Sequence, residues 1–404
     1  MTVETNMNSK MFPEVVMARL VLILYYVSMR FPPHRLPAEW MCLTALMASL
    51  CGAAHAGVPT EWVSRGVGGG GALFAPSLSP HNPGELYITS DMSEVFRSTN
   101  YAVSWDLVNF KRLQGNRGGV VQFTSDPNIL YSIDYTVVNG YDLRRPVKST
   151  DGGKSWTVLP NDPTSGEVYQ LFADPNNTNR LILCNYANVY FSNNGGTTFT
   201  LKFGGDNSGS GCLIGGVFWE NATIIAGCSI GMWVSTDNGA SFLPVGTGIP
   251  ATEAIVSFAA ARAATQLRLV CVTASSSLIW GGMEIENIYY DQSYRGIYTM
   301  EWGSATWVKR VSGITAGHQL ALVAMARNSV SVMYVGGQDA NEYPVLYKTV
   351  NGGQSWVSAI TPYINGNILT GWAGQGGDRG WTYGGGPVGL AVAPLDSSIA
   401  AFTD

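Results

Sequence analysis

A short pattern of turn-forming residues recurs along the chain. It reads Ser/Thr-x-Asp/Asn-x-Gly-x-x-Trp/Phe, and we call it the turn repeat. The steps between its copies are 51, 43, 43 and 114 residues, and the first copy is degenerate. A recurring period of this kind constrains the architecture more strongly than any single element does. The copies begin at Ser98, Ser149, Ser192, Ser235 and Thr349.

The chemistry of the turn repeat is that of a hairpin turn. An Asp or Asn side chain can accept hydrogen bonds from backbone amides two residues further on. Glycine supplies a positive φ where a Cβ would clash, and the aromatic residue begins the next strand. In the best-preserved copy these roles fall to Asp151, Gly153 and Trp156. We therefore expect Asp151 and its counterpart Asp237 to form turns rather than to act in catalysis.

The period predicts an all-β fold, a β-propeller of about six or seven four-stranded blades. Such blades need roughly 40–50 residues each, and a degenerate unit at 298–307 falls inside the longest step. Residues 251–265 are rich in alanine, and the sequence leaves open a short helix or a loop between blades there. A second pattern, a Pro/Asn/Asp turn followed by an apolar run, predicts entries to inner strands. It occurs at residues 79–87, 125–131, 173–182 and 393–400.

The composition is that of a turn-rich β-protein and excludes some partners. The chain has 48 Gly, 12 Trp and 19 Tyr, and only 13% of its residues are charged. Its net charge is −5 and it has no basic cluster, which argues against a nucleic acid partner because phosphate backbones are bound by Lys and Arg. Glycine, tryptophan and tyrosine at these levels favour a secreted all-β protein.

The N-terminal residues resemble an export signal. Residues 41–56 hold an apolar core and end in Ala54-His55-Ala56, a small-x-small cleavage pattern. We therefore expect residues 1–56 to be an extension with a secretory signal peptide, and residues 57–404 to be the propeller. The apolar run at 20–27 is too short to span a bilayer. The mature protein is expected to be secreted or periplasmic, with no membrane span.

Cysteine and histidine offer little chemistry. Cys212 and Cys228 flank an expected hairpin, so a disulfide between them is one possibility in an oxidising compartment. No His/Cys cluster has metal-ligand spacing, and no metal or other cofactor is expected. The two histidines of the mature chain, His81 and His318, are far apart in the sequence. This argues against a Ser-His-Asp catalytic triad.

The turn repeat matches the Asp-box, or BNR repeat, which joins outer strands of propeller blades. The segment from Glu85 to Arg97 further resembles the first blade of family 74 glycoside hydrolases, the xyloglucan-cleaving enzymes. There a strand ends in Thr-Asp, and a short loop and an aromatic-Arg pair follow. The resemblance implies that Asp91 is the catalytic base and that Arg97 contacts substrate. One departure is that residues 92–94 (Met-Ser-Glu) replace the family's Ile-Gly-Gly.

Enzymes of that family have two propellers with the active cleft between them, and the second propeller supplies the acid from a Gly-Asp-x-Gly-Gly-type loop. By resemblance the nearest match here is Asp378, in the Gly-rich segment 376–381. Residues 384–404 repeat the sequence pattern of the N-terminal entry to the first blade. Two interpretations stay open: the last strand closes the ring with the N-terminal blade, or the chain is one half of a two-propeller protein.

Aromatic residues give a second line of prediction, because sugar faces stack on Trp and Tyr. Trp372 and Trp381 flank a glycine-rich loop, and Tyr135 could line the same face. The alternative is that these aromatics only pack between strands. Asp134, at the end of an apolar run in the next blade, is a rival to Asp91.

Two functions of different classes follow. The first is a secreted glycoside hydrolase that acts on a β-glucan such as xyloglucan through a pair of Asp residues, one as acid and one as base. The second is a non-catalytic propeller that binds a glycan or a surface protein. A sialidase is disfavoured, because the arginines that would bind a substrate carboxylate are sparse.

Overall fold

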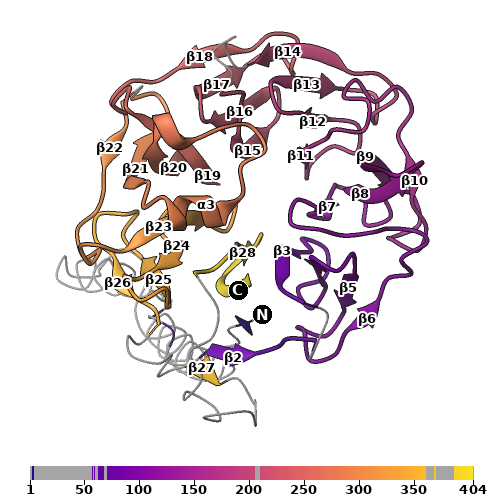
Figure 1. The fold of residues 1–404 in the computed structure, drawn as a ribbon. Coiled ribbons are helices and arrows are strands. Elements are labelled where there is room, and N and C mark those ends of the chain that lie inside the picture. Colours follow the sequence, from indigo (N-terminus) through magenta and orange to yellow (C-terminus); the bar gives the residue numbers. More distant parts are fainter. Residues whose placement is uncertain are drawn as a thin grey trace, which may run out of the picture. The chain divides into compact units, whose positions relative to one another are not determined.

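The described part of the chain forms seven β-sheets arranged in a ring (Figure 1), antiparallel except for the pair β2 (Trp62–Ser64) and β27 (Ile368–Leu369) of the seventh sheet. The computed structural model describes residues 2–3, 57, 59, 62–67, 71–204, 210–304, 306–360, 368–369 and 386–403. Six sheets have four strands in sequence order, and the seventh has five. The fold is a β-propeller, as the period of the turn repeat predicts.

Each four-stranded sheet runs from an inner first strand to an outer fourth strand. The first three sheets are β3 (Leu73–Leu78), β4 (Leu86–Ser90), β5 (Val95–Ser98), β6 (Asp106–Leu107); β7 (Gln122–Phe123), β8 (Leu130–Val138), β9 (Tyr141–Ser149), β10 (Thr157–Val158); β11 (Gln170–Ala173), β12 (Leu181–Cys184), β13 (Asn188–Ser192), β14 (Thr200–Gly204). The next three are β15 (Ile214–Glu220), β16 (Thr223–Cys228), β17 (Gly231–Ser235), β18 (Leu243–Val245); β19 (Glu253–Ala263), β20 (Gln266–Ser275), β21 (Tyr294–Glu301), β22 (Val308–Lys309); β23 (Gln319–Ala324), β24 (Met333–Gln338), β25 (Pro344–Thr349), β26 (Val357–Ser358). Two short helices, η1 (Ser276–Leu278) and α3 (Ile285–Tyr290), lie between β20 and β21.

The seventh sheet closes the ring. Its strands are β27 (Ile368–Leu369), β2 (Trp62–Ser64), β1 (Thr2–Val3), β29 (Asp396–Thr403) and β28 (Gly389–Ala393), in that spatial order. The inner strand β28 packs beside both β23 of the sixth sheet and β3 of the first. Residues from both ends of the described chain therefore share one sheet, in which β29 pairs with β1.

Because successive strands are antiparallel, the connections fall on two faces. Connections from first to second strand and from third to fourth share one face, which holds every copy of the turn repeat. Connections from second to third strand, and from each sheet to the next, share the other face, which we call the loop face. The Pro/Asn/Asp turns lie between first and second strands, for example between β3 and β4, so they lead into second strands.

All copies of the turn repeat share the hydrogen bonds that their backbone N–H groups donate to side chains. The lead hydroxyl accepts the N–H of the residue four positions on, as Ser149 does from Gly153 at 2.8 Å. Asp151 Oδ1 accepts the N–H of Ser155 at 2.8 Å and its Oδ2 accepts the Ser155 hydroxyl. The degenerate first copy keeps this scheme, with Ala102 donating to Ser98 at 2.9 Å. The carboxylates of Asp151 and Asp237 therefore accept hydrogen bonds within their own turns, as the sequence predicts.

A cross-strand pair of a tyrosine and a cation recurs just before the turn repeat. Tyr87 is opposite Arg97, Tyr131 is opposite Lys148, and Tyr334 is opposite Lys348. Each cation lies over the ring of its partner at 5.0–5.6 Å. These pairs stabilise the second and third strands of their sheets by cation–π attraction.

The alanine-rich segment 251–265 is neither a helix nor a loop, which corrects that expectation. It forms β19, the long inner strand of the fifth sheet, with Ala260 and Ala261 buried. Neighbouring inner strands converge here, and Gly216 and Gly227 of the fourth sheet lie against Phe258. Small side chains suit such close packing, so tertiary context overrides the helix preference of alanine.

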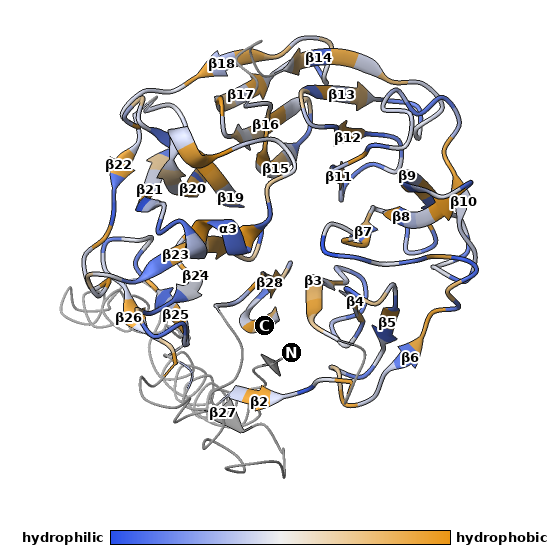
Figure 2. Ribbon diagram, in the orientation of Figure 1, coloured by the Kyte–Doolittle hydropathy of each residue, from blue (hydrophilic) through white to orange (hydrophobic). Residues whose placement is uncertain are grey.

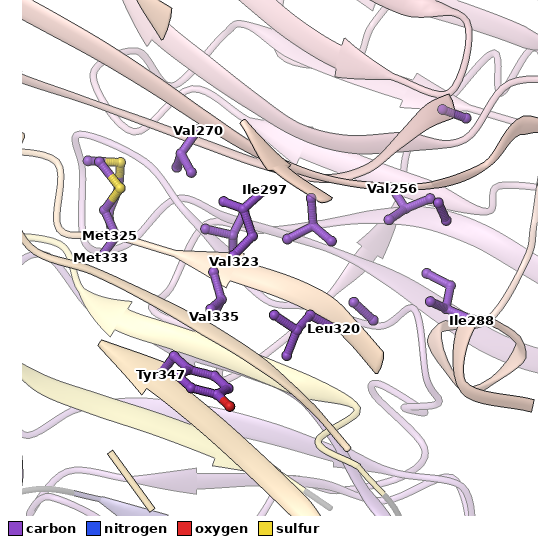
Figure 3. Packing of buried hydrophobic residues seen from close by; sticks show 14 of the residues in the cluster. Val256, Val270, Ile288, Ile297, Leu320, Val323, Met325, Met333, Val335 and Tyr347 are labelled. Atoms are coloured by element: carbon purple, nitrogen blue, oxygen red, sulfur yellow. The ribbon is translucent and has the colours of Figure 1, made fainter. Parts of the chain in front are cut away.

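The core is made of apolar side chains between adjacent sheets. Hydrophobic residues recur along the strands of every sheet (Figure 2). The largest cluster joins the fifth and sixth sheets through Val270, Ile297 and Val335, and Ile288 of α3 stands at one end of it (Figure 3). The helix is thus packed into the protein and fixes the loop between β20 and β21.

Candidate functional site

A pocket of about 470 Å³ opens at the centre of the loop face. It is lined by Phe74, Gln122, Gln170, Ile214, Val256 and Leu322, which come from the first strands of six sheets, and by Val388 next to β28. The pocket is therefore the mouth of the central channel, and we call it the channel pocket. Its volume lies within the range of small-molecule sites, roughly 300–1,000 Å³.

The wall on the side of the second and third sheets is aromatic. Tyr135 of β8 and Tyr169, just before β11, line it together with Arg144 of β9. The guanidinium carbon of Arg144 lies 4.4 Å from the centroid of the Tyr169 ring and 5.8 Å from that of Tyr135. Burial raises the pKa of Tyr135, although the nearby Arg144 charge opposes the shift. The Tyr135 phenol is therefore neutral near pH 7 and can donate a hydrogen bond.

The opposite wall comes from the loop between β20 and β21. Glu284 is the N-cap of α3, and a capping box with Asn287 satisfies the first turn of the helix. Glu286 follows in that first turn. Arg117, from the loop between β6 and β7, forms ion pairs with both Glu284 and Glu286. The guanidinium thus links two walls of the channel pocket that lie far apart in the sequence.

The structure places Asp91 in the short loop between β4 and β5, on the loop face. Its side chain is exposed. The N–H of Ala72 donates to Asp91 Oδ1 at 3.1 Å, and the N–H of Asp91 donates to the Ala72 carbonyl at 3.3 Å. These two bonds fix the carboxylate against the start of β3 and leave Oδ2 open to solvent or ligand.

The loop that follows Asp91 adjoins the channel pocket. Ser93 lines the pocket, and its carbonyl accepts the N–H of Gly115 at 2.9 Å, two residues before Arg117. Ser93 has a φ of 75°, in the left-handed region that favours glycine. The serine therefore adopts a glycine-like backbone at one of the positions where the family pattern has glycine.

The structure does not bring Arg97 to this site. Its guanidinium binds Glu85 Oε1, at 3.0 Å from Nε and 2.5 Å from Nη2, and it also lies over Tyr87. The register Tyr87–Arg97 places it near the end of β5 that leads into the turn repeat, away from the loop face. Its position matches those of Lys148 and Lys348, so its geometry is that of the structural tyrosine–cation pairs.

Asp134 has structural partners as well. Its Oδ1 accepts the N–H of Gln114 at 3.0 Å, and its Oδ2 pairs with Arg145 at 2.9 Å. The side chain is nearly buried and anchors the loop between β6 and β7. Among the remaining candidates, Asp378, Trp372 and Trp381 lie outside the described residues.

The pocket residues Arg117, Arg144, Glu284 and Glu286 were missed by the sequence reasoning. Arg144 lies on the same side of β9 as Asp142. No local sequence pattern predicts how long the hairpin of β8 and β9 is. Glu284 and Glu286 sit in an insertion between β20 and β21, ahead of the degenerate unit at 298–307. Their one signal is the unusual length of this connection, which separates strands that elsewhere follow each other closely.

Cysteines and histidines do not add a reactive group to the described part of the chain. Cys184, Cys212, Cys228 and Cys271 are all buried free thiols, so the Cys212–Cys228 disulfide is absent here. Burial raises the pKa of Cys184 and Cys228. Within the described ranges, no group of three or more His, Cys, Asp or Glu side chains is arranged to hold a metal ion. Nor is any helix in those ranges both long and apolar enough to cross a membrane.

Comparison with known proteins supports the class of fold. No family model matches the chain, and no curated protein sequence matches it. Among solved structures, the GH74 enzyme of Niastella koreensis is similar with a TM-score of 0.60 and 17% identity, over 84% of this chain and 52% of that enzyme. The GH74 xyloglucanase of Xanthomonas campestris gives a TM-score of 0.58 and 16% identity over the same shares. The chain thus spans about half the length of these enzymes.

A propeller of another class is also similar. The WD40 repeats of RRP9 match with a TM-score of 0.51 and 10% identity, over 81% of this chain and 86% of that chain. At such identities the likeness establishes a common β-propeller fold. Function has to be argued from the site, since one fold serves many activities.

Proposed function

We propose that this chain is a propeller of a glycoside hydrolase acting on a β-glucan such as xyloglucan, with Asp91 as general base. One observation carries the proposal: the exposed Asp91 carboxylate, held by the backbone of Ala72, lies two residues before Ser93, which lines the channel pocket. A general base needs a fixed position and access to water or substrate. Asp91 has both, whereas the carboxylates of the turn repeat and of Asp134 are occupied.

The remaining parts of the machinery belong to the proposal. Asp378 is the candidate acid, and Trp372 and Trp381 are the candidate stacking platforms for the glucan. Inversion of configuration requires two carboxylates roughly 6.5–9.5 Å apart, with room for a water molecule between substrate and base. Likeness to half of each GH74 enzyme is consistent with a second propeller completing the cleft. Export by the predicted signal at 41–56 would place the protein with extracellular polysaccharides.

The test is release of reducing sugar from xyloglucan and a panel of other β-glucans. Asp91→Asn should lower the rate by about 10²–10⁴-fold, the range associated with loss of a general base. Asp106→Asn is the matched control, because Asp106 is equally exposed in the same sheet but lies on the outer strand β6. Equal loss in both variants, or no loss in Asp91→Asn, would contradict the assignment.

A second candidate function is non-catalytic glycan binding. It is favoured by the Arg117 ion pairs, which occupy the two glutamates of the channel pocket and leave them poorly suited to proton transfer. Binding of a glucan without release of sugar, in the full-length protein, would support this candidate over hydrolysis.

A further inference from the structure

Arg144 differs from Arg117, the other arginine that lines the channel pocket. Ion pairs engage six arginines of the described chain, namely Arg97, Arg117, Arg145, Arg180, Arg262 and Arg268. The guanidinium of Arg144 has no carboxylate within ion-pair distance in the described residues. Its contacts are the rings of Tyr135 and Tyr169.

The position of Arg144 is fixed through its backbone. Its N–H donates to the carbonyl of Gly166 at 2.7 Å, and its own carbonyl accepts the N–H of Val168 at 3.1 Å. It is also paired with Tyr135 in the ladder of β8 and β9. The backbone of Arg144 is thus fixed by bonds to residues 166–168 on one edge of β9 and by the ladder with β8 on the other, and the two tyrosine rings pack against its guanidinium.

A half-buried guanidinium without a counter-ion is an anion-binding group. Moving its charge out of water has a cost that a charge-assisted hydrogen bond can offset, and the planar fork fits a carboxylate with two parallel bonds. The Tyr135 hydroxyl and the tyrosine rings add a neutral donor and flat apolar surface, a combination suited to a sugar ring. The channel pocket has room for a ligand of that size.

We propose that Arg144 makes the channel pocket a subsite for a sugar that carries a carboxylate, that is, for a uronate unit of an acidic glycan. The proposal rests on the proposed function only in taking the ligand to be a glycan; it does not require hydrolysis. It extends the proposed substrate from a neutral β-glucan to one with acidic units.

Asp142 gives the proposal a sharp internal control. It lines the same pocket, two residues from Arg144 and therefore on the same side of β9, and it is exposed. It forms no ion pair with Arg144 among the described residues. A carboxylate ligand must approach against this negative charge, so removing the charge should strengthen binding of the acidic ligand and leave a neutral ligand unaffected.

The experiment is calorimetric titration of the full-length protein with two probes at low salt. One probe is cellotetraose and the other is its counterpart with C6 oxidised to carboxylate, so that only the charge differs. We expect the acidic probe to bind about tenfold more tightly, the equivalent of one charge-assisted bond. Arg144→Gln should abolish the preference, Arg144→Lys should keep part of it, and Asp142→Asn should increase it about threefold.

Arg112→Gln is the matched surface control, because Arg112 is exposed and contacts the Lys154 carbonyl outside the pocket. Far-UV circular dichroism checks that each variant folds. The proposal is overturned if the parent binds both probes equally or neither, if Arg144→Gln keeps the preference, or if an acidic peptide of matched charge binds more tightly than the sugar. If Arg144→Gln does not fold, the proposal is tested by the preference of the parent protein for the acidic probe and by the change of that preference in Asp142→Asn.

The two proposals fail separately. Preference for the acidic probe without any sugar release overturns the hydrolase and leaves the subsite intact. Release of sugar from neutral glucan without a preference for the acidic probe overturns the subsite and leaves the hydrolase intact.

Discussion

Arg117 forms an ion pair with Glu284, a residue 167 positions further along the chain. The same guanidinium nitrogen lies 3.0 Å from Glu286 Oε1. Arg117 also stacks on Phe74 of β3, at 5.1 Å from the ring centroid. One side chain thus connects the first sheet and the loop after it to the α3 segment that comes from the fifth sheet.

Arg117→Gln should loosen the α3 segment with little loss of global stability. The Arg117 and Glu284 side chains are 39% and 50% exposed, and exposed ion pairs contribute about 0–1 kcal/mol. We expect the unfolding temperature to fall by less than about 3 °C, while amide hydrogen exchange within residues 276–293 becomes faster. A large loss of stability with unchanged exchange would show that Arg117 acts elsewhere. Arg112→Gln serves again as the control.

Gly153→Ala should destabilise the protein more than Gly140→Ala does. Both glycines have positive φ, 83° and 80°, so each substitution carries the same backbone strain, about 1 kcal/mol. A Cβ on Gly153 would lie 2.5 Å from the Tyr87 hydroxyl, whereas one on Gly140 meets nothing within 4 Å. We expect Gly153→Ala to cost about 1–3 kcal/mol more, measured by urea unfolding. Equal costs would mean that the turn yields to the methyl group.

The Asp151 and Asp237 turns should lose stability in acid. Hydrogen bonds from Ser155 and Ser241 lower the pKa of Asp151 and Asp237 to about 2, from 3.8. A pKa below that of the unfolded chain contributes stability above pH 4, and this contribution is lost as the pH falls toward 2. In the double variant Asp151→Asn/Asp237→Asn, the urea midpoint should therefore depend less on pH between 4 and 2. Asn194 and Asn351 occupy the same position in other copies, so the turns should still form.

Arg97→Gln should impair stability and leave glycan binding unchanged. It removes the cation from Glu85, whose side chain is only 12% exposed. A loss of about 1–3 kcal/mol is expected from an unpaired, mostly buried carboxylate. Arg97→Lys should recover part of it, because Lys148 and Lys348 fill the equivalent positions. A stable Arg97→Gln variant with weakened binding would instead support the sequence prediction that Arg97 contacts substrate.

The architecture was predictable because the turn repeat is a local signal. Asp151, Gly153 and Trp156 specify a turn through bonds within eight residues, and the period of such turns specifies the blade. The α3 segment shows the limit of this reasoning. Its place is set by packing of Ile288 and Tyr289 against distant sheets and by Arg117, none of which a local pattern records.

The sequence could place candidate site residues only where the end of a strand determines their position. Asp91 follows β4 directly, so the end of a strand locates it, and Tyr135 was expected on the same face. Arg97 was placed with them because of its neighbours in sequence, but strand direction carries it to the other end of the sheet. The role proposed for Arg144 could not be predicted, because it depends on the lack of a carboxylate partner among the described residues, and no sequence pattern records that.

The loop between β20 and β21 leaves the sheet after Ser275 and rejoins the ladder at Tyr294, opposite Ala274. The ladder of β20 and β21 continues from this pair, with a register shift between Ala274 and Thr273. This loop supplies one wall of the channel pocket, through Glu284 and Glu286, whereas the first strands of six sheets line another part of it. Exchanging residues 284–286 of this one loop would therefore change one wall of the pocket and leave the wall formed by the first strands as it is, which offers a route to change ligand preference.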